Sequence, residues 1–593
     1  MKLITIALAL SALANQVLGQ DKDKEPSKAN APAVELFPKG YLNHQALSAA
    51  IKKVADAKPD RVKVRSIAKS GLGRDVWLVE IGKGVTQTPK PALLVVGNLE
   101  GDHIVGSHVA LGLIEALAST PDKDAGWLDL YRVYIVPRLN PDGAERSLET
   151  PAKAERLNLR PVDRDRDGKT NEDGPDDLNG DGLLTTMRVK DPKTATLVAD
   201  DKDPRILRKA DPNKSEKPIY AEESEGIDND ADGLRNEDPP GGVNLNRNWP
   251  HKWTEFDLEA GFSPASEPEV LALIRFALEH PEIAAVWTFG LNDNLAEEPK
   301  KPGSTLDDAD LPIFVELSKL FNKSTASKDE KDKPKPGSPA GKGTPNPGAT
   351  TDGAMAEWAY YQFGALGLAS RLWSTPEIPA PQGSAEKPKA EEKPKEKADE
   401  KPKETAPAIP DDGEARWLEW NDKVVGGQAF VPFAPFDHPT LGKVEIGGWK
   451  PGVRLTPPVA DIAAITDKHL AFLKALGERL PKLAILEPKA KAKGAGLYEV
   501  TALVENAGYL PTALAQGSKT RKAAPVLVKL LPVDKIKILS GKRLEKIDSL
   551  GGSGGRKDFR WLIQVPAGTK TVTIEASCPK AGRVEAVIPL VEN

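Results

Sequence analysis

The sequence contains one cysteine, no basic face and, beyond its N-terminus, no long hydrophobic run. Because Cys578 is the only cysteine, a disulfide framework and a cysteine-based metal site are excluded. The formal net charge is −5 and the lysines and arginines are not gathered on one face, which argues against nucleic acid as the main partner. No later segment reaches the ~18 apolar residues of a membrane-spanning helix, so no membrane span is predicted.

The N-terminus has the pattern of a secretory signal peptide. Lys2 is followed by the apolar run Leu3 to Leu13, and small residues stand at Ala14 and Gly19. We therefore expect residues 1–19 to be a cleaved signal and the protein to be exported to the periplasm, the cell surface or the medium. The alternative is an uncleaved N-terminal anchor.

At 593 residues the chain is too long for one small core, so two or more folded units are expected. Segments rich in charge, proline and alanine with almost no large apolar residues cannot bury enough surface to offset ordering entropy. The composition predicts a mobile leader at 20–34, disordered linkers at 323–349 and 378–412, and one folded domain over 35–322, 350–377 and 413–482. Residues 488–593 contain short β runs separated by turn signals, which predicts a separate β-sandwich.

The first folded domain shows strands that alternate with helical patterns. Buried-strand runs are expected at Ala92 to Val96, Arg132 to Pro137 and Ala284 to Phe289. Helical patterns are expected at Tyr41 to Ala55 and Glu267 to Leu278. This alternation predicts an α/β fold with helices packed against a sheet.

A candidate site lies directly after the strand at Ala92 to Val96. The turn Glu100-Gly101-Asp102-His103 follows it, and a helical pattern begins soon afterwards. Open α/β sheets place their chemistry where a strand ends in a turn and feeds a helix. A Glu and a His three residues apart can ligate one metal ion, whereas the alternative is an ordinary polar turn.

Residues 163–238 contain three copies of a pattern typical of calcium-binding loops. Oxygen-bearing residues alternate and a glycine stands at the sixth position, which is how a short loop wraps a calcium ion. None of the copies has Glu at the twelfth position, where Gly174, Arg188 and Pro239 stand, so Glu172, Asp173, Glu237 and Asp238 are expected to supply the missing carboxylates. The structural calcium candidates are Asp163, Asp165, Asp167, Asp173, Asp177, Asn179, Asp181, Asp228, Asp230, Asp232 and Asp238. The alternative is an acidic, solvated insertion.

Taken in order, these pieces resemble the zinc carboxypeptidases of the carboxypeptidase A-like class over roughly residues 40–480. The resemblance is most specific in GNLEGDHIVGS, VPRLNPDG, GGVNLNRNWP and DGAMAEWAYYQFGALGLASRLW. The calcium-type insertion and the run FDHPTLGKVEIGGW are similar to a bacterial branch of that family. The resemblance implies a mixed sheet flanked by helices, and a zinc ion held by His and Glu of an HxxE motif plus a later His. It also implies a Glu that acts as general base on zinc-bound water.

The sequence departs from the family pattern at three chemical positions. Glu100 stands where the family has His, and His103 where it has Glu. Depending on register, the third ligand is replaced by Trp287 or Gly290, and no histidine lies between His280 and His438. A catalytic zinc needs three protein ligands, so at most two are available here.

Arg371 stands in the place of the catalytic Glu. Arginine stays protonated and cannot act as a base near neutral pH. Glu377 and Glu445 are the nearby carboxylates that would have to replace it. We expect instead that Glu100 and Arg371 form an ion pair in place of zinc and water.

The substrate side of the pattern is retained. Asn246 and Arg247 match the family's Asn-Arg pair, and Arg156 and Arg160 match its upstream arginine segment. Planar guanidinium groups suit bidentate carboxylate recognition, although an arginine cluster paired to nearby acidic loops is the structural alternative.

Together these features predict an exported, zinc-free pseudoenzyme that binds peptide or peptidoglycan-peptide C-termini. Two alternatives remain: an active metallocarboxypeptidase with a non-standard zinc site, and a structural surface protein. The sequence does not indicate an oligomeric state.

Overall fold

The computed structural model describes residues 35–82, 90–164, 166–191, 193–301, 304–326, 351–374, 413–531 and 536–591. The predicted signal peptide and leader, most of both linkers, and Asp165 lie outside the described residues. The predicted first residue of the first linker, 323, is too early, because helix α6 (Leu311–Thr325) continues to Thr325.

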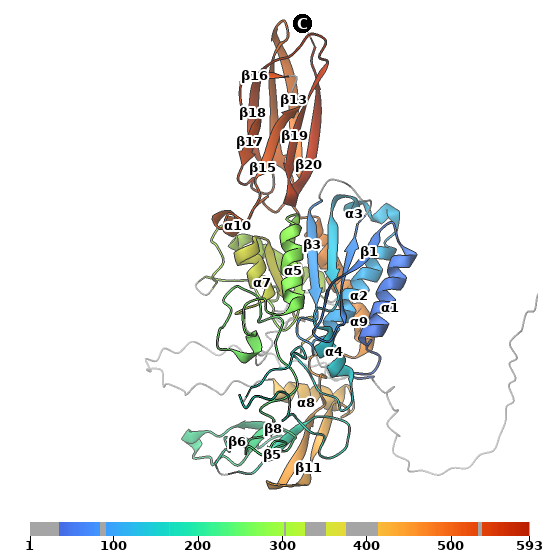
Figure 1. Ribbon diagram of the computed structural model, residues 1–593, viewed down its shortest axis with the longest axis vertical. Helices are drawn as coiled ribbons and strands as arrows, with labels where there is room; N and C mark the ends of the chain where they lie inside the picture. Colours follow the sequence, from blue (N-terminus) through green and yellow to red (C-terminus); the bar gives the residue numbers. More distant parts are fainter. Residues whose placement is uncertain are drawn as a thin grey trace, which may run out of the picture. The chain divides into compact units, whose positions relative to one another are not determined.

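A six-stranded mixed sheet forms the centre of the first domain (Figure 1). Its strands, in spatial order, are β1 (Val62–Lys69), β2 (Asp75–Ile81), β4 (Arg132–Val136), β3 (Ala92–Gly97), β9 (Ile283–Phe289) and β10 (Leu366–Ser370). β1, β2 and β4 pair antiparallel, and β4, β3, β9 and β10 pair parallel. The predicted α/β fold with a mixed sheet is therefore confirmed.

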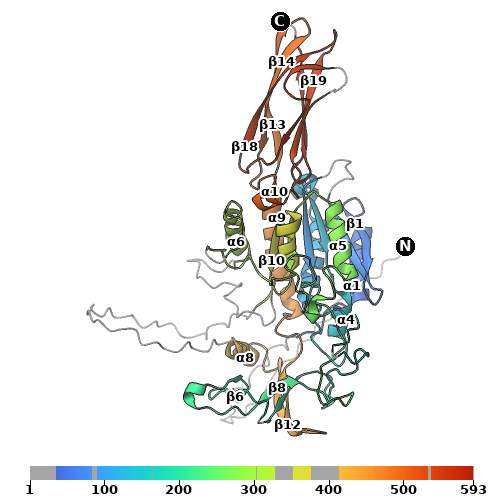
Figure 2. The same cartoon turned by 60° about the vertical axis from the view of Figure 1, so that its left-hand side comes forward.

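Helices cover both faces of this sheet, as Figures 1 and 2 show. α1 (His44–Ala57), α2 (Ile104–Ser119), α6 and α9 (Ile462–Gly477) pack with one core, and α5 (Pro268–Glu279) and α7 (Met355–Trp358) with the other. Successive residues of β3 point alternately into the two cores: Leu93 and Val95 into the first, Leu94 and Val96 into the second. A strand buried on both faces explains why its sequence is apolar without alternation.

A second sheet joins the acidic insertion to the segment after the second linker. Its order is β11 (Phe430–His438), β12 (Gly442–Trp449), β5 (Thr186–Val189) and β8 (Ala221–Ser224). The short pieces β6 (Leu197–Ala199), β7 (Leu207–Lys209), α3 (Gly126–Leu130), α4 (Pro141–Leu148) and α8 (Glu414–Lys423) complete the domain. Strand β8 reads AEES, which has no apolar pattern, so nothing in the sequence indicated this sheet.

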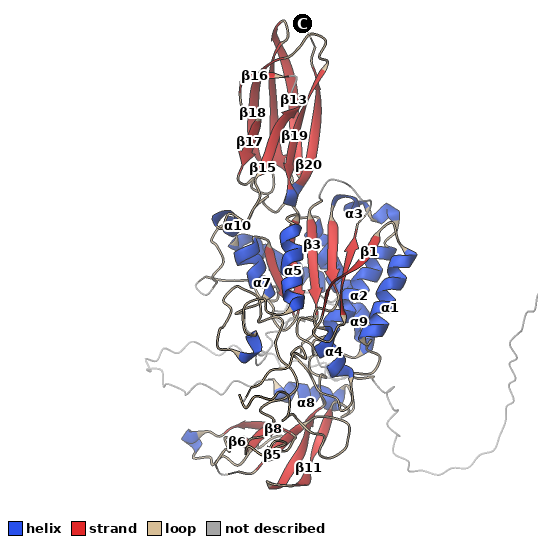
Figure 3. Cartoon of the chain, in the orientation of Figure 1, coloured by secondary structure: helices blue, strands red, loops and turns tan. Residues whose placement is uncertain are grey.

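The C-terminal region is a β-sandwich, as predicted (Figure 3). One sheet contains β13 (Leu483–Gly494), β14 (Leu497–Asn506), β18 (Gly555–Gln564) and β16 (Lys537–Ser540), and the other β17 (Leu544–Ile547), β15 (Val526–Leu531), β19 (Thr571–Cys578) and β20 (Gly582–Pro589). The predicted start at residue 488 is late, because β13 already pairs with β14 at Leu483. The amides of Ala515 and Gln516, in α10 (Ala515–Lys519), donate to the Asp310 carboxylate of the first domain at 2.8 and 3.0 Å. No helix of the described residues is long and apolar enough to cross a membrane.

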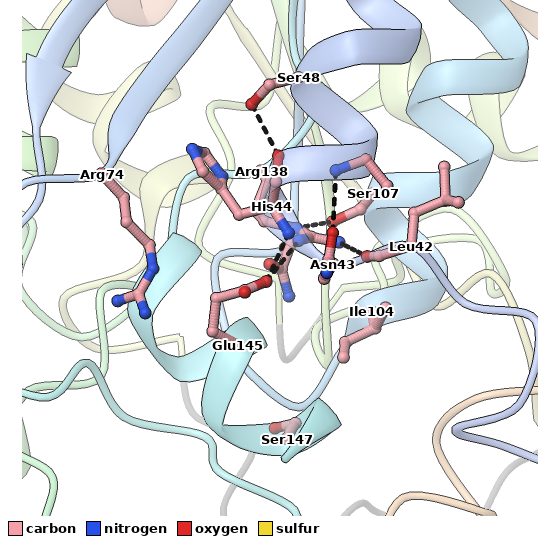
Figure 4. A network of polar contacts seen from close by, with 12 residues as sticks. Leu42, Asn43, His44, Ser48, Arg74, Ile104, Ser107, Arg138, Glu145 and Ser147 are labelled. Carbon is pink, nitrogen blue, oxygen red and sulfur yellow. Dashed lines mark hydrogen bonds and ion pairs between the residues drawn. The ribbon is translucent and has the colours of Figure 1, made fainter.

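A buried arginine fixes the loop after β4 near the start of α2. The guanidinium of Arg138 donates to the Leu42 carbonyl at 2.8 Å and to the Ser107 hydroxyl at 3.0 Å, and it pairs with Glu145 at 3.5 Å (Figure 4). Glu145 also accepts from the amide of His44, at the first residue of α1. The network ties α1 and α2 to the loop that faces the candidate site.

Glu269 in α5 is a buried carboxylate whose ionisation should make the stability of the domain depend on pH. Its side chain is fully buried and neither carboxylate oxygen has a hydrogen-bond partner. Burial raises its pKa from 4.5 to about 8, and the charge of Glu267 adds to the effect. Because the folded-state pKa is raised, the stabilising effect of the neutral carboxyl is complete below pH 4.5 and lost as the pH rises through about 8.

We therefore expect Glu269 to contribute a fall of about 1.4 kcal/mol per pH unit to the free energy of unfolding between those two values. Glu269→Gln should flatten this decline in urea unfolding measured at a series of pH values. The control is Glu279→Gln, an exposed position of the same helix. Identical pH profiles for the wild type and Glu269→Gln would contradict the assignment.

Candidate functional site

The candidate site lies at the end of β3, where the chain turns sharply before α2. Asn98 has a φ of 55°, and its side-chain amide donates to the carbonyls of Glu100 and Gly101 at 2.7 and 3.1 Å. The His103 amide donates to the Glu100 carbonyl at 3.0 Å. These bonds turn the Glu100 and His103 side chains inward, where both are almost fully buried.

Glu100 is held by Asn246 and lies against Gly290. Its Oε1 accepts a 2.8 Å hydrogen bond from the Asn246 side-chain amide, whose own oxygen accepts from the Met355 amide. Its Oε2 has no hydrogen-bond partner. A Cβ atom added at Gly290 would lie 2.6 Å from that oxygen. Burial raises the pKa of Glu100 to about 7, although the Asn246 hydrogen bond opposes the rise.

Of the two residues considered for the third-ligand position, Gly290 is the one that lies beside Glu100. Gly290 follows β9 and faces Glu100. Trp287 instead packs in the core and donates from its indole nitrogen to the Ser370 hydroxyl at 3.0 Å. Neither Trp287 nor Gly290 therefore offers a metal ligand beside Glu100.

Asp102 and Arg156 form the second ionisable pair of the turn. The Arg156 Nε lies 3.7 Å from Asp102 Oδ2, and the other oxygen of Asp102 has no hydrogen-bond partner. Burial raises the pKa of Asp102 to about 6, although the charge of Arg156 counteracts this. Arg156 remains 28% exposed, which leaves it within reach of a ligand in solution.

His103 and Arg371 are electrostatic neighbours. Burial, and then the Arg371 charge, lower the pKa of His103 to about 3, so the imidazole is neutral at physiological pH. Arg371 follows β10, its amide donates to Asp293 Oδ2 at 3.0 Å, and burial lowers its pKa while Asp293 opposes that change. The expected ion pair between Glu100 and Arg371 is wrong: in the described residues Glu100 bonds to Asn246 alone, and the Arg371 charge acts on His103 and Asp293.

These residues do not fit a catalytic zinc ion. Among the described residues, no set of three His, Cys, Asp or Glu ligand atoms within 4.8 Å of one another includes Glu100 or His103. The Nδ1 atom of His103 faces Gly106 of its own helix, whereas Glu100 Oε2 faces Gly290. Glu445 pairs with Lys190 in the second sheet, and Glu377 lies outside the described residues. His108 accepts from the Leu42 amide and is a packing residue.

The substrate-side residues are bonded within the chain. Arg247 pairs with Asp257 and, at 3.1 Å, with Glu259. Arg160 pairs with Glu267 at 2.8 Å, and its guanidinium lies 4.5 Å from the centre of the exposed Phe262 ring. The sequence placed these arginines beside the site but could not show that each has an acidic partner, because those partners come from the separate loop 257–267.

The first and third acidic loops lie together in the insertion. Asp173 and Asp238 are both fully buried and form a β-bridge between the two loops. The Asp238 carboxylate accepts hydrogen bonds from the backbone amides of Arg164 and Asn171, and the Asp173 carboxylate accepts one from the amide of Asn236. Three groups have ligand oxygens within 4.8 Å of one another: Asp167, Glu172 and Asp230; Asp173, Asp230 and Glu237; and Asp228, Asp230 and Asp232. The carboxylate oxygens of Glu172 and Glu237 are buried without a hydrogen-bond partner.

The second loop forms no such group among the described residues. Asp177 accepts from the amides of Asp181 and Gly182 at 3.0 and 2.8 Å, and Asn179 accepts from Asp181 at 2.9 Å. The first residue of each loop has this turn-closing role, as Asp163 accepts from the Gly168 amide. A further carboxylate, Glu225, lies beside the second loop. Burial raises its pKa, hydrogen bonds from Thr185 oppose the rise, and the charges of Asp181 and Asp177 add to it.

Comparison with known proteins identifies the first domain and leaves the second unassigned. The profile of the family described as "Zinc carboxypeptidase" matches residues 47–393, and one described only as a "Domain of unknown function" matches residues 482–589. Mouse (Mus musculus) carboxypeptidase M is 34% identical over 123 residues, which are 19% of this chain and 27% of that protein. Carboxypeptidase SOL1 of Arabidopsis thaliana is 30% identical over 116 residues, 19% of this chain and 23% of that protein. The chain thus matches about a quarter of the length of these relatives. A solved metallo-carboxypeptidase from Burkholderia cenocepacia has a TM-score of 0.29 at 15% identity, covering 55% of this chain and 59% of that chain.

The contact between Glu100 and Gly290 predicts how a side chain at position 290 changes the free energy of unfolding. Gly290→Ala should destabilise the wild type by about 1–3 kcal/mol, because the new methyl group overlaps Glu100 Oε2 in a tightly packed interior. In a Glu100→Ala background the same substitution should have a much smaller effect. Denaturant unfolding of the four chains measures the coupling, with Gly126→Ala as a control because no atom lies within 4 Å of its Cβ position. Equal effects of Gly290→Ala in both backgrounds would show that the two residues are not in contact.

Proposed function

Because this chain belongs to the zinc carboxypeptidase family, we propose that it is an exported member without zinc-dependent catalysis, which binds the C-terminal ends of peptides, including cell-wall peptides. The observation that carries the proposal is the contact between Glu100 and Gly290. The carboxylate oxygen occupies the space that a side chain at position 290 would need, and its partner Asn246 saturates the other oxygen. A donor set of Glu100 and His103 alone is short of the three protein ligands of a catalytic zinc site.

Arg371 supports the same conclusion. A fixed positive charge beside His103 disfavours a dication there, and a guanidinium cannot accept a proton from water. Arg371 is also anchored by its backbone to Asp293, so its position belongs to the fold.

Arg156 is the residue best suited to meet a peptide carboxylate. Its only ionic partner among the described residues is Asp102 at 3.7 Å, beyond hydrogen-bond distance, whereas Arg160 and Arg247 are closely paired to acidic side chains. The rings of Phe256 and Phe262 are 92% and 70% exposed near the Arg247 and Arg160 ion pairs, and they offer apolar surface for the last side chains of a peptide.

A second candidate function, structural calcium binding, is favoured by the paired acidic loops. Asp230 belongs to all three groups of convergent carboxylates, and Glu172 and Glu237 present buried oxygens without donors. The exposed Lys169 pairs with Asp167 at 2.9 Å, but gathered carboxylates still repel one another, and Ca²⁺ prefers six to eight such oxygens. We propose that calcium holds the first and third loops together.

The peptide-binding proposal is tested with fluorescent peptides that have a free or an amidated C-terminus. We expect the full chain to bind only the free form, and Arg156→Ala to weaken binding roughly tenfold or more through loss of a charge-assisted hydrogen bond. The control is Arg416→Ala, an exposed position of α8. No C-terminal residue should be released. Chelator-sensitive release would show an active metallocarboxypeptidase, and absence of binding to both peptides would favour a structural surface protein.

The calcium proposal is tested by thermal and urea unfolding with and without calcium. Calcium at 100-fold above its Kd should raise the free energy of unfolding by about 2.7 kcal/mol per site. Asp230→Asn should abolish most of this gain, because Asp230 is shared by all the groups. The control is Asp211→Asn, a carboxylate that caps a turn outside the loops. A wild type whose unfolding is indifferent to calcium would contradict the proposal.

A further inference from the structure

Glu225 is a buried carboxylate without a counter-charge. It directly follows β8 and its side chain is fully buried. Its Oε1 accepts from the amide and the hydroxyl of Thr185, at 2.6 and 3.1 Å, whereas Oε2 is buried without any hydrogen-bond partner. An ionised carboxylate in such a position costs several kcal/mol unless another group compensates it.

The second acidic loop lies beside this carboxylate. Thr185 is the ninth residue counted from Asp177, and its carbonyl accepts the Glu225 amide at 3.2 Å. The amide of Asp176, just before the loop, donates to the Glu225 carbonyl at 3.1 Å. The backbone of Glu225 is thus hydrogen-bonded to the residue before the loop and to the ninth residue of the loop. The loop carboxylates Asp177 and Asp181 are close enough to raise the pKa of Glu225.

In the part of the chain that the structure describes, no lysine or arginine pairs with these three carboxylates. Among the described residues, none of Asp177, Asp181 and Glu225 forms an ion pair within 4.0 Å. The twelfth residue of the loop, Arg188, is directed away: it donates to the carbonyls of Pro204 and Arg205. The loop has the oxygen pattern of a calcium loop, but its own twelfth position offers no carboxylate.

We infer that the second loop binds its own calcium ion, with Glu225 as the carboxylate ligand that its twelfth position lacks. Asp177, Asn179 and Asp181 supply the first, third and fifth ligands, and the carbonyl of Leu183 stands at the seventh position. The side chains must turn to complete the set, because the three carboxylates are not yet gathered within 4.8 Å. The inference rests on the proposed calcium binding of the insertion, and it adds a site that the first and third loops do not share.

The test counts the calcium ions bound by the full chain, after removal of metal, by calorimetric titration with calcium chloride. Glu225→Gln and Asp177→Asn should each bind one ion fewer than the wild type, and the double variant should lose no further ion. Asp230→Asn should lose ions of the other loops and keep the one that depends on Glu225. The matched control is Glu222→Gln, an exposed carboxylate of β8, which should bind as many ions as the wild type.

A folding defect is distinguished by unfolding the metal-free chains. Glu225→Gln keeps an oxygen for Thr185 and removes a buried charge, so it should be at least as stable as the wild type without calcium. If calcium binds and Asp230→Asn loses ions while Glu225→Gln loses none, the second site is refuted and the proposed calcium role stands. If the wild type binds no calcium, both fail.

Discussion

The buried contact between the Glu100 carboxylate and the backbone at Gly290 is the constraint around which the end of the central sheet is arranged. It joins the turn after β3 to the residue after β9, and through Asn246 it reaches the start of α7. Three segments far apart in sequence thus meet on one side chain. A larger residue at 290 would require the Glu100 carboxylate to shift away from its present position.

Two regions rich in acidic groups neutralise their charge in different ways. At the sheet end, burial favours the neutral form of Glu100, and arginine side chains pair with Asp102, Asp257 and Glu267. In the insertion, carboxylates converge on Asp230, where Lys169 pairs with Asp167, and around Glu225, which has no ion pair among the described residues. Burial and arginines compensate the acidic groups of the first region, whereas the proposed calcium would compensate those of the second. The proposed function therefore keeps the family fold and assigns metal binding to the insertion instead of the end of the central sheet.

The sequence predicted those features that depend on local patterns. A few consecutive residues were enough to predict the all-apolar strand β3, the turn at Glu100 to His103 and the three acidic loops. Polar strands could not be predicted in this way: β8 has no apolar face, and the alternating Lys and Ala residues of β13 hide the start of the sandwich at Leu483. Long-range partners were also hidden. The Glu100–Arg371 pair failed because Asn246 is the closer partner, and Glu225 carries no signal until β8 brings it to the second loop.

The most direct measurement of the central claim is a zinc titration of the metal-stripped full chain in saturating calcium, which occupies the acidic loops. The chain is compared with a Glu100→Gln/His103→Ala double variant. We predict that both chains bind the same amount of zinc, because Glu100 and His103 do not form a zinc site. One additional tightly bound zinc ion in the wild type, lost in the double variant, would contradict the account.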